Sequence, residues 1–212
     1  MTTDQFTKIK TLMLARSSHG SRKAGMCAME AVAFLAGEPH SDAPKCTAAP
    51  VRRFVIATND WCNDEERQQL KPYLLRLITT SSGGREADKH AAFLFADWAV
   101  REVAPAALDA RNKPELAARL RAIAPIVDKA SAIAARDETY EVRKAAYAAA
   151  ATYAAAYAAA AADAAAAAYA AADAAAYAAA YAAADADADA RQTSLAGRLT
   201  ILDRVLTQAY GK

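Results

Sequence analysis

The sequence predicts an all-α protein with a compact multi-helix head, one long alanine-rich helix and a returning C-terminal helix. Residues 145–190 contain 34 alanines and no Gly, Pro, Lys or Arg, and alanine has the highest helix propensity of all residues. Elsewhere, apolar residues recur at spacings of three and four, as they do along one face of a helix. No segment shows the alternation of apolar and polar residues that is typical of a strand.

Three parts are expected along the chain: a helical head over 1–136, a long alanine-rich helix over 137–190 and a C-terminal helix over 191–212. Continuous helix is predicted from about 139 to 190 because no Gly or Pro interrupts that stretch. About 50 residues of helix would measure roughly 75 Å, whereas a globule of this size has a radius of gyration near ~17 Å. The long helix is therefore expected to extend beyond the head.

The first half of the head is predicted to contain helices over 4–15, 25–36 and 51–61, each with apolar residues at helical spacing. The second of these is apolar almost throughout, which is typical of a buried helix. It should end at Gly37, because glycine is the preferred residue just after a helix. Residues 38–50 contain three prolines and are predicted to form a connector.

A further helix is predicted to begin at Asn63, because Asn63 and Glu66 have the spacing of a capping box. Pro72 should kink or restart this helix, since proline cannot donate a backbone hydrogen bond. Residues 79–84 are rich in Ser, Thr and Gly and are expected to form a loop.

A strong helix over 86–103 is expected to end at Pro105. Asn112 and Glu115 repeat the capping-box spacing ahead of a short helix to about residue 124.

The chain is predicted to end in a helix that packs back onto the head. A break is expected near 186–194, because several Asp residues lie unfavourably at a helix C-terminus, and Ser194 is a candidate cap for the last helix. An apolar stripe follows at helical spacing: Leu195, Leu199, Leu202 and Leu206.

The alanine-rich segment carries a Tyr/Asp-Ala-Ala-Ala repeat, and a period of four advances about 40° per repeat around a helix. No face stays aromatic, so the repeat is not a coiled-coil seam. It is either an expanded repeat tolerated as a spacer, a surface for packing between chains, or a functional surface such as an ice-binding face. Because alanine helices are marginal in water unless packed, we expect a homo-oligomer, most simply a dimer.

Charge and cysteine content narrow the class of protein. The formal net charge is +2, and the alanine-rich run contributes five Asp and no cation. That run is a poor membrane span because buried Asp is costly in hydrocarbon. The sequence also has no dense block of Lys and Arg, so nucleic-acid binding is not expected. The chain begins with polar residues rather than a signal peptide and has three widely spaced cysteines, which favours a cytoplasmic location.

Glu30 is the least expected residue of the head, because it lies in an apolar helix three residues after Cys27. A buried carboxylate must be paired, hydrogen-bonded or protonated. As a functional group it would be a general base or a metal ligand. As a structural group it would form an ion pair with a residue such as Arg101, or accept hydrogen bonds from backbone N–H groups of the loop 38–46. Arg101 also has a partner at helical spacing in Asp97.

A ligand-binding site is predicted around this helix, and no catalytic residue is assigned. Cations flanking a Gly/Ser loop could hold an anion, and histidines near a cysteine could form a Cys-His site. Neither a C-x-x-C pair nor a phosphate loop nor a dinucleotide motif is present, so we expect no metal and no cofactor. The candidate ligand-binding residues are Arg16, His19, Arg22, Lys23, Cys27, Glu30, His40 and Asp42.

One string in the head resembles a group of uncharacterised helical proteins from actinobacteria and bacteriophages. The shared positions are Gly25-Met26-Cys27-Ala28-Met29-Glu30-Ala31-Val32-Ala33, Ala36-Gly37-Glu38-Pro39, Ser41-Asp42, Cys46 and Leu70-Lys71-Pro72-Tyr73. Several members also carry an alanine-rich repeat near the C-terminus. The resemblance covers about residues 17–105. His40 departs from it, since an aromatic residue such as Trp is expected there, which argues against His40 as a shared catalytic base.

These features predict a non-enzymatic, oligomeric interaction or sequestration protein. The resemblance implies a phage-derived protein that acts on a host factor. The cations around the Gly/Ser loop indicate a small anionic ligand as the other target, bound in a pocket made by the head and the oligomer interface. Two alternatives remain: a cysteine- or metal-dependent enzyme that uses Cys27, Glu30 and the 38–46 loop, and a structural spacer within an assembly.

Overall fold

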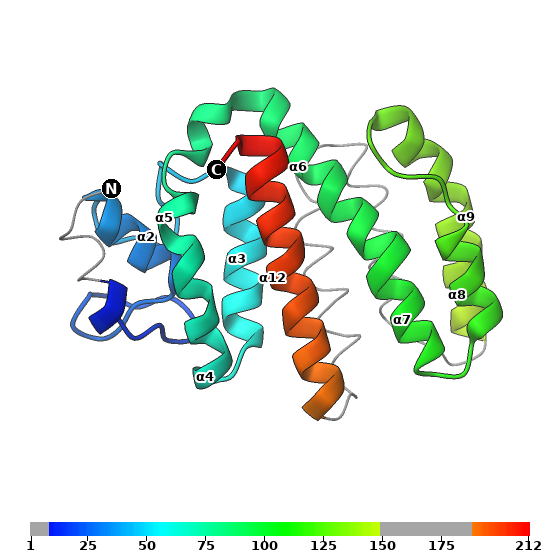
Figure 1. Ribbon diagram of the computed structural model, residues 1–212, viewed down its shortest axis with the longest axis horizontal. Coiled ribbons are helices and arrows are strands. Elements are labelled where there is room, and N and C mark those ends of the chain that lie inside the picture. Colours follow the sequence, from blue (N-terminus) through cyan, green and yellow to red (C-terminus); the bar gives the residue numbers. More distant parts are fainter. Residues whose placement is uncertain (1–8, 149–187) are drawn as a thin grey trace.

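The computed structural model describes residues 9–148 and 188–212, and within these ranges the chain contains helices and no strand (Figure 1). The predicted all-α class is therefore confirmed. The α-helices are α2 (Ala28–Ala36), α3 (Ala49–Trp61), α4 (Asp64–Arg67), α5 (Leu74–Leu77), α6 (Gly84–Trp98), α7 (Ala104–Asp109), α8 (Pro114–Arg121), α9 (Lys129–Ala148) and α12 (Ala188–Tyr210). Tighter or wider turns join some of them: the 3-10 turns η1 (Gln68–Tyr73) and η2 (Thr80–Gly83) and the π-helical turn η3 (Ala99–Val103).

The first hydrophobic core lies among α2, α3, α5, α6 and α12. Its centre is aromatic: the rings of Phe54 and Phe95 stack with centroids 4.4 Å apart, and Trp98 meets Phe54 edge-on at 5.9 Å. The C-terminal helix α12 packs against α3 and α6 in this core (Figure 1), with its leucine stripe buried or partly buried. The predicted return of the C-terminal helix is confirmed.

A second hydrophobic core joins α6 and α7 to α8 and α9 at the other end of the molecule (Figure 1). The buried residues of α9 recur at helical spacing: Ala132, Ala135, Thr139, Val142 and Ala146. This helix begins at Lys129, earlier than the predicted start near 139, because its first turns pack on α8. The rest of the predicted long helix, residues 149–187, lies outside the described residues.

The helix α6 does not end at Pro105, as predicted, but continues through η3 into α7. In η3 the N–H of Ala104 bonds to the carbonyl of Ala99, five residues back. A regular helix would press the proline ring against the carbonyl four residues earlier. The wider π turn relieves that clash, so Pro105 occupies the first turn of α7, where proline is tolerated.

The predicted helix over 4–15 is present only at 9–11 within the described residues, and the chain leaves the helix at Leu12. The side chain of Gln68 replaces the helical bonds. Its amide oxygen accepts the N–H of Leu14 and its amide nitrogen donates to the Leu14 carbonyl, each at 3.0 Å. Tertiary hydrogen bonds therefore override the apolar spacing of this segment.

Local signals were correct at Gly37, which ends α2 with φ 76°, and at the Asn63 capping box of α4. Three others were wrong. The predicted 79–84 loop is the turn η2 followed by the start of α6. Asn112 does not cap α8 but takes a left-handed conformation (φ 55°) after α7. Ser194 lies inside α12, which is continuous from Ala188, so no break occurs over 188–194.

Candidate functional site

The N-terminus of α2 explains the carboxylate in its apolar sequence. Cys27 is the N-cap and Glu30 the third helical residue of a capping box. The Cys27 N–H donates to Glu30 Oε2 at 2.8 Å, and the Cys27 sulfur accepts the Glu30 N–H at 3.5 Å. The Cys-x-x-Glu spacing is the usual Ser/Thr-x-x-Glu capping pattern with a thiol in place of a hydroxyl, and this signal was missed in the sequence.

Two histidines from separate loops meet the same carboxylate, which is only 1% exposed. Glu30 Oε1 accepts the backbone N–H of His19 at 2.6 Å, and Glu30 Oε2 lies 3.0 Å from His19 Nδ1. His40 Nε2 lies 3.3 Å from Glu30 Oε1 and 2.9 Å from the His19 carbonyl oxygen. We call Cys27, Glu30, His19 and His40 the Glu30 clasp. It ties the loops before and after α2 to that helix.

The partners predicted for Glu30 were wrong. Arg101 pairs instead with Asp97 at 3.3 Å, as its helical spacing indicated. The loop 38–46 was expected to donate backbone N–H groups to Glu30. Its N–H groups bind Glu38 instead: Lys45 and Cys46 donate to the Glu38 carboxylate at 2.7 and 2.8 Å.

The protonation of the clasp follows from its geometry. His40 Nε2 faces two acceptors, a carboxylate and a carbonyl, so it must carry the proton and donate. His40 Nδ1 is buried with no hydrogen-bond partner among the described residues. Burial alone raises the pKa of Glu30. The hydrogen bonds from the N–H groups of His19 and Cys27 outweigh that effect and hold its pKa below the ordinary value of 4.5.

The thiol of Cys27 has the opposite character. Burial raises its pKa from 9.0 to about 12, and the charge of Glu30 adds to the rise. The thiol is therefore protonated at neutral pH, and a protonated thiol is a poor nucleophile. The clasp as a whole is a closed arrangement in which the carboxylate accepts two backbone N–H groups and lies against both histidine rings.

The remaining predicted site residues lie apart from the clasp. Arg22 donates to the Glu38 carbonyl oxygen at 3.1 Å, and its guanidinium lies 4.8 Å from the centre of the Phe34 ring. Arg16 and Lys23 are exposed and Asp42 is half-buried. None of these three forms a hydrogen bond or ion pair within 9–148 and 188–212.

A pocket of about 360 Å³ lies beside the clasp, and we call it the α2 pocket. Gly25 lines it and takes a φ of 140°, with its Cα against the His19 ring, so a side chain there would clash with the ring. Of its other residues, only Arg22 was predicted. The remaining lining residues are Thr11, Leu12, Met13, Met26 and Phe34.

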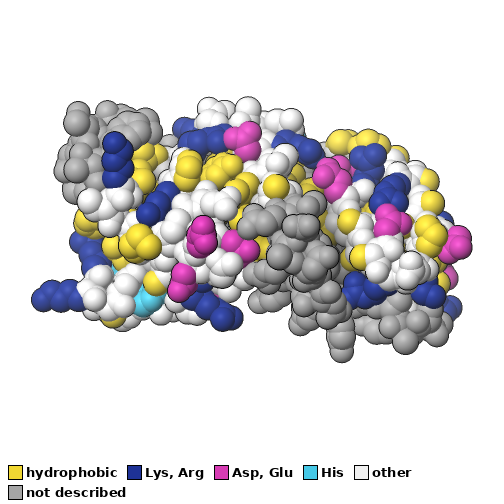
Figure 2. Space-filling model, turned by 60° about the horizontal axis from the view of Figure 1, so that its bottom comes forward, with side chains coloured by type: hydrophobic (Ala, Val, Ile, Leu, Met, Phe, Trp, Pro, Cys, Tyr) yellow, Lys and Arg dark blue, Asp and Glu magenta, His cyan; other side chains and the backbone are white. Residues whose placement is uncertain are grey.

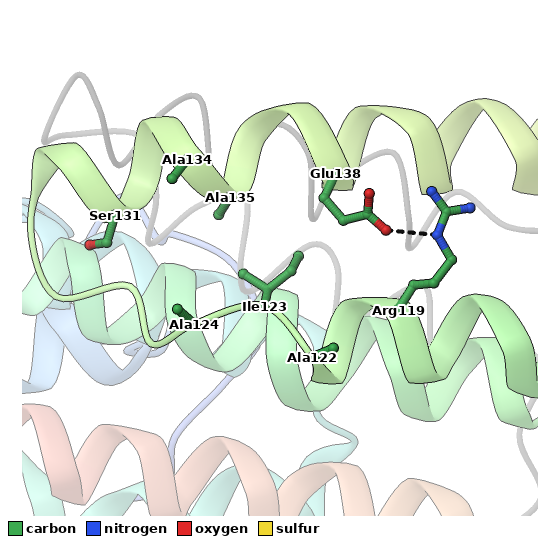
Figure 3. A pocket seen from close by; sticks show the side chains of 8 residues that line it. All are labelled: Arg119, Ala122, Ile123, Ala124, Ser131, Ala134, Ala135 and Glu138. Atoms are coloured by element: carbon green, nitrogen blue, oxygen red, sulfur yellow. Dashed lines mark hydrogen bonds and ion pairs between the residues drawn. The ribbon is translucent and has the colours of Figure 1, made fainter.

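A second hollow of about 380 Å³ lies between α8 and α9, and sequence reasoning gave no signal for it. Figure 3 shows small side chains along it, with an ion pair between Arg119 Nε and Glu138 Oε1 (2.7 Å) near one end and Ser131 toward the other. We call it the α8–α9 groove. Its other lining residues are Ala122, Ile123, Ala124, Ala134 and Ala135.

Across the described part of the chain, His, Cys, Asp and Glu form no group suited to a metal ion, and no helix is long and apolar enough to span a membrane. Comparison with protein families, curated proteins and solved structures finds no match.

Proposed function

We propose that the protein is a non-enzymatic interaction protein that associates with copies of itself, and that a second copy docks in the α8–α9 groove. The observation that carries this proposal is the lining of the groove, in which five of the eight residues are small or apolar: Ala122, Ile123, Ala124, Ala134 and Ala135. Of these, Ala122, Ala124 and Ala134 are exposed, so the hollow of about 380 Å³ presents apolar surface between α8 and α9. Exposed apolar surface in a hollow is typical of an interaction site.

The groove suits a closely approaching helix surface. Its floor is formed mainly by alanine side chains, with Ile123 between them, and small side chains allow two backbones to approach closely. The ion pair between Arg119 and Glu138 bridges α8 and α9 (Figure 3), which supports a groove already shaped before a partner arrives.

The proposed occupant is the alanine-rich segment of the second copy. Residues 149–187 contain 29 alanines, four Asp and no Lys or Arg, whereas residues 110–148 contain eight Lys or Arg against five Asp or Glu. A methyl-covered acidic segment therefore meets a small-residue groove in a net basic region. Lys, Arg, Asp and Glu side chains all lie among apolar ones at this end of the molecule (Figure 2). Charge complementarity of this kind favours association and fixes register.

The enzymatic alternative has less support. It would use Cys27 as a nucleophile or Glu30 as a base, but the pKa of the Cys27 thiol is raised to about 12. The Glu30 carboxylate is buried and already accepts hydrogen bonds from the clasp. A base needs a free lone pair within reach of a substrate proton, and Glu30 has its oxygens occupied.

The test is the mass of the full chain in solution, measured by size-exclusion chromatography with light scattering. We expect twice the chain mass of 22.3 kDa at micromolar concentration. Ala134→Glu places a carboxylate in the groove, where it fills space and repels the acidic segment, so this variant should be monomeric. Ala106→Glu makes the same change at an exposed position of α7 and should stay dimeric.

A monomeric wild-type protein would contradict self-association. A dimeric Ala134→Glu variant, with a circular dichroism spectrum equal to that of the wild type, would show that the second copy docks elsewhere.

A further inference from the structure

The α2 pocket combines an apolar lining with one fixed cation. Leu12, Met13, Met26 and Phe34 supply the apolar surface, and Met13 is 67% exposed at the rim. A pocket of about 360 Å³ lies at the small end of the range typical of small-molecule sites.

Arg22 is held in place before any ligand arrives. Its guanidinium lies over the Phe34 ring at 4.8 Å, and one of its nitrogens donates to the Glu38 carbonyl oxygen at 3.1 Å. Glu38 is itself fixed by the N–H groups of Lys45 and Cys46. An arginine carries five N–H donors, so a guanidinium anchored in this way can still bind an anion with little loss of side-chain entropy.

The chain segment that supplies most of the pocket lining is basic. Residues 9–26 include four Lys or Arg and no Asp or Glu. From outside this segment, the Lys71 ammonium lies 3.9 Å from the sulfur of Met13, a lining residue. Figure 2 shows Lys and Arg side chains around the end of the molecule that carries α2. These cations favour an anion in the pocket, whereas the Glu30 carboxylate beside it is already held by its own hydrogen-bond donors.

We propose that the α2 pocket binds a small amphipathic anion: a carboxylate or phosphate group on Arg22, with a short aliphatic or aromatic body against Met13, Met26 and Phe34. The helix α2, which contributes Phe34 to the pocket, lies at the opposite end of the molecule from α8 and α9 (Figure 1). The ligand site therefore does not depend on the proposed self-association.

The probes are octanoate and octyl phosphate, titrated into the full chain by calorimetry below their micelle-forming concentrations. Octylammonium and acetate are the control probes, one with the opposite charge and one without the apolar body. We expect saturable binding of at least one of the two anionic probes and no detectable binding of either control probe. The head group that binds more tightly indicates whether the natural ligand carries a carboxylate or a phosphate.

Two variants with the same change in charge test the contact. Arg22→Gln should lower the affinity for the anionic probe by about tenfold or more, because a hydrogen bond to a charged group is lost. Arg16→Gln removes an exposed cation from the same segment that does not line the pocket, and should change affinity less than about twofold, since a solvated charge contributes little.

Failure of both anionic probes to bind would overturn the proposal. Equal binding of octylammonium, or equal weakening by the two variants, would also overturn it, because either result means that Arg22 does not recognise the anion.

Discussion

Replacing Glu30 with Gln is expected to destabilise the protein by about 3 kcal/mol. Glu30 Oε2 accepts the Cys27 N–H at 2.8 Å and faces His19 Nδ1 at 3.0 Å. Whichever oxygen becomes the amide nitrogen, that nitrogen is a donor facing donors. A hydrogen bond to a charged group contributes about 1.5–3 kcal/mol, and a buried donor left without a partner costs a similar amount. The His19 ring can change tautomer and accept from the new amide, whereas the backbone N–H groups of His19 and Cys27 can only donate.

The assay is urea unfolding followed by far-UV circular dichroism. The same destabilisation should lower the melting temperature by about 6–12 °C for a chain of this size. Glu86→Gln is the control, because Glu86 is 83% exposed and its one ion pair within the described residues is with Lys89 at 2.8 Å. This variant should change stability by less than about 0.5 kcal/mol. A loss below about 1 kcal/mol in Glu30→Gln would refute the view that the clasp holds the loops around α2.

Three further outcomes are expected. Because the pKa of Glu30 in the folded protein lies below 4.5, its contribution is present above that pH and is lost as pH falls through the folded-state pKa. The stability deficit of Glu30→Gln should therefore shrink in urea titrations at acid pH, and a constant deficit would contradict this. A thiol reagent at neutral pH should label half-buried Cys46 before buried Cys27, and rapid Cys27 labelling would mean that its thiol ionises. Thr79→Asn should stabilise the protein by about 1 kcal/mol in the same unfolding assay, because Thr79 is β-branched with a φ of 72°, and a loss of stability would show that its side chain has another role.

All four residues of the clasp were predicted as candidate site residues, but the sequence did not predict that the two histidines are the partners of Glu30. Glu30 stands out because a carboxylate in an apolar helix needs partners, and that argument is local. His19 and His40 reach it from loops on either side of α2, and no helical spacing relates loop residues to a helix terminus. Arg101 was a reasonable partner by charge alone, but Asp97 on the same helix is nearer to it.

The fold was predictable where the signal was a local pattern, as at Gly37 and at the Asn63 capping box. It was not predictable where distant groups supply the hydrogen bonds. The side chain of Gln68, 54 residues away in sequence, accepts the Leu14 N–H and so replaces a helical hydrogen bond there. In the same way, the extension of α6 past Pro105 depends on a wide turn that the sequence does not mark.

The π-helical turn η3 also determines the direction in which the side chains after it point, relative to those before it. Five of the residues of α6, η3 and α7 that face the second core are spaced four apart: Ala92, Ala96, Val100, Ala104 and Leu108. In a regular helix each such step rotates the edge by about 40°, so the last residue would point about 160° away from the first. One extra residue in the turn sets the rotation back by about 100°. Deleting one residue from 99–103 would remove this extra residue and turn the segment into regular helix, so Leu108 would keep its direction toward the core while Pro105 lost the wide turn that accommodates its ring.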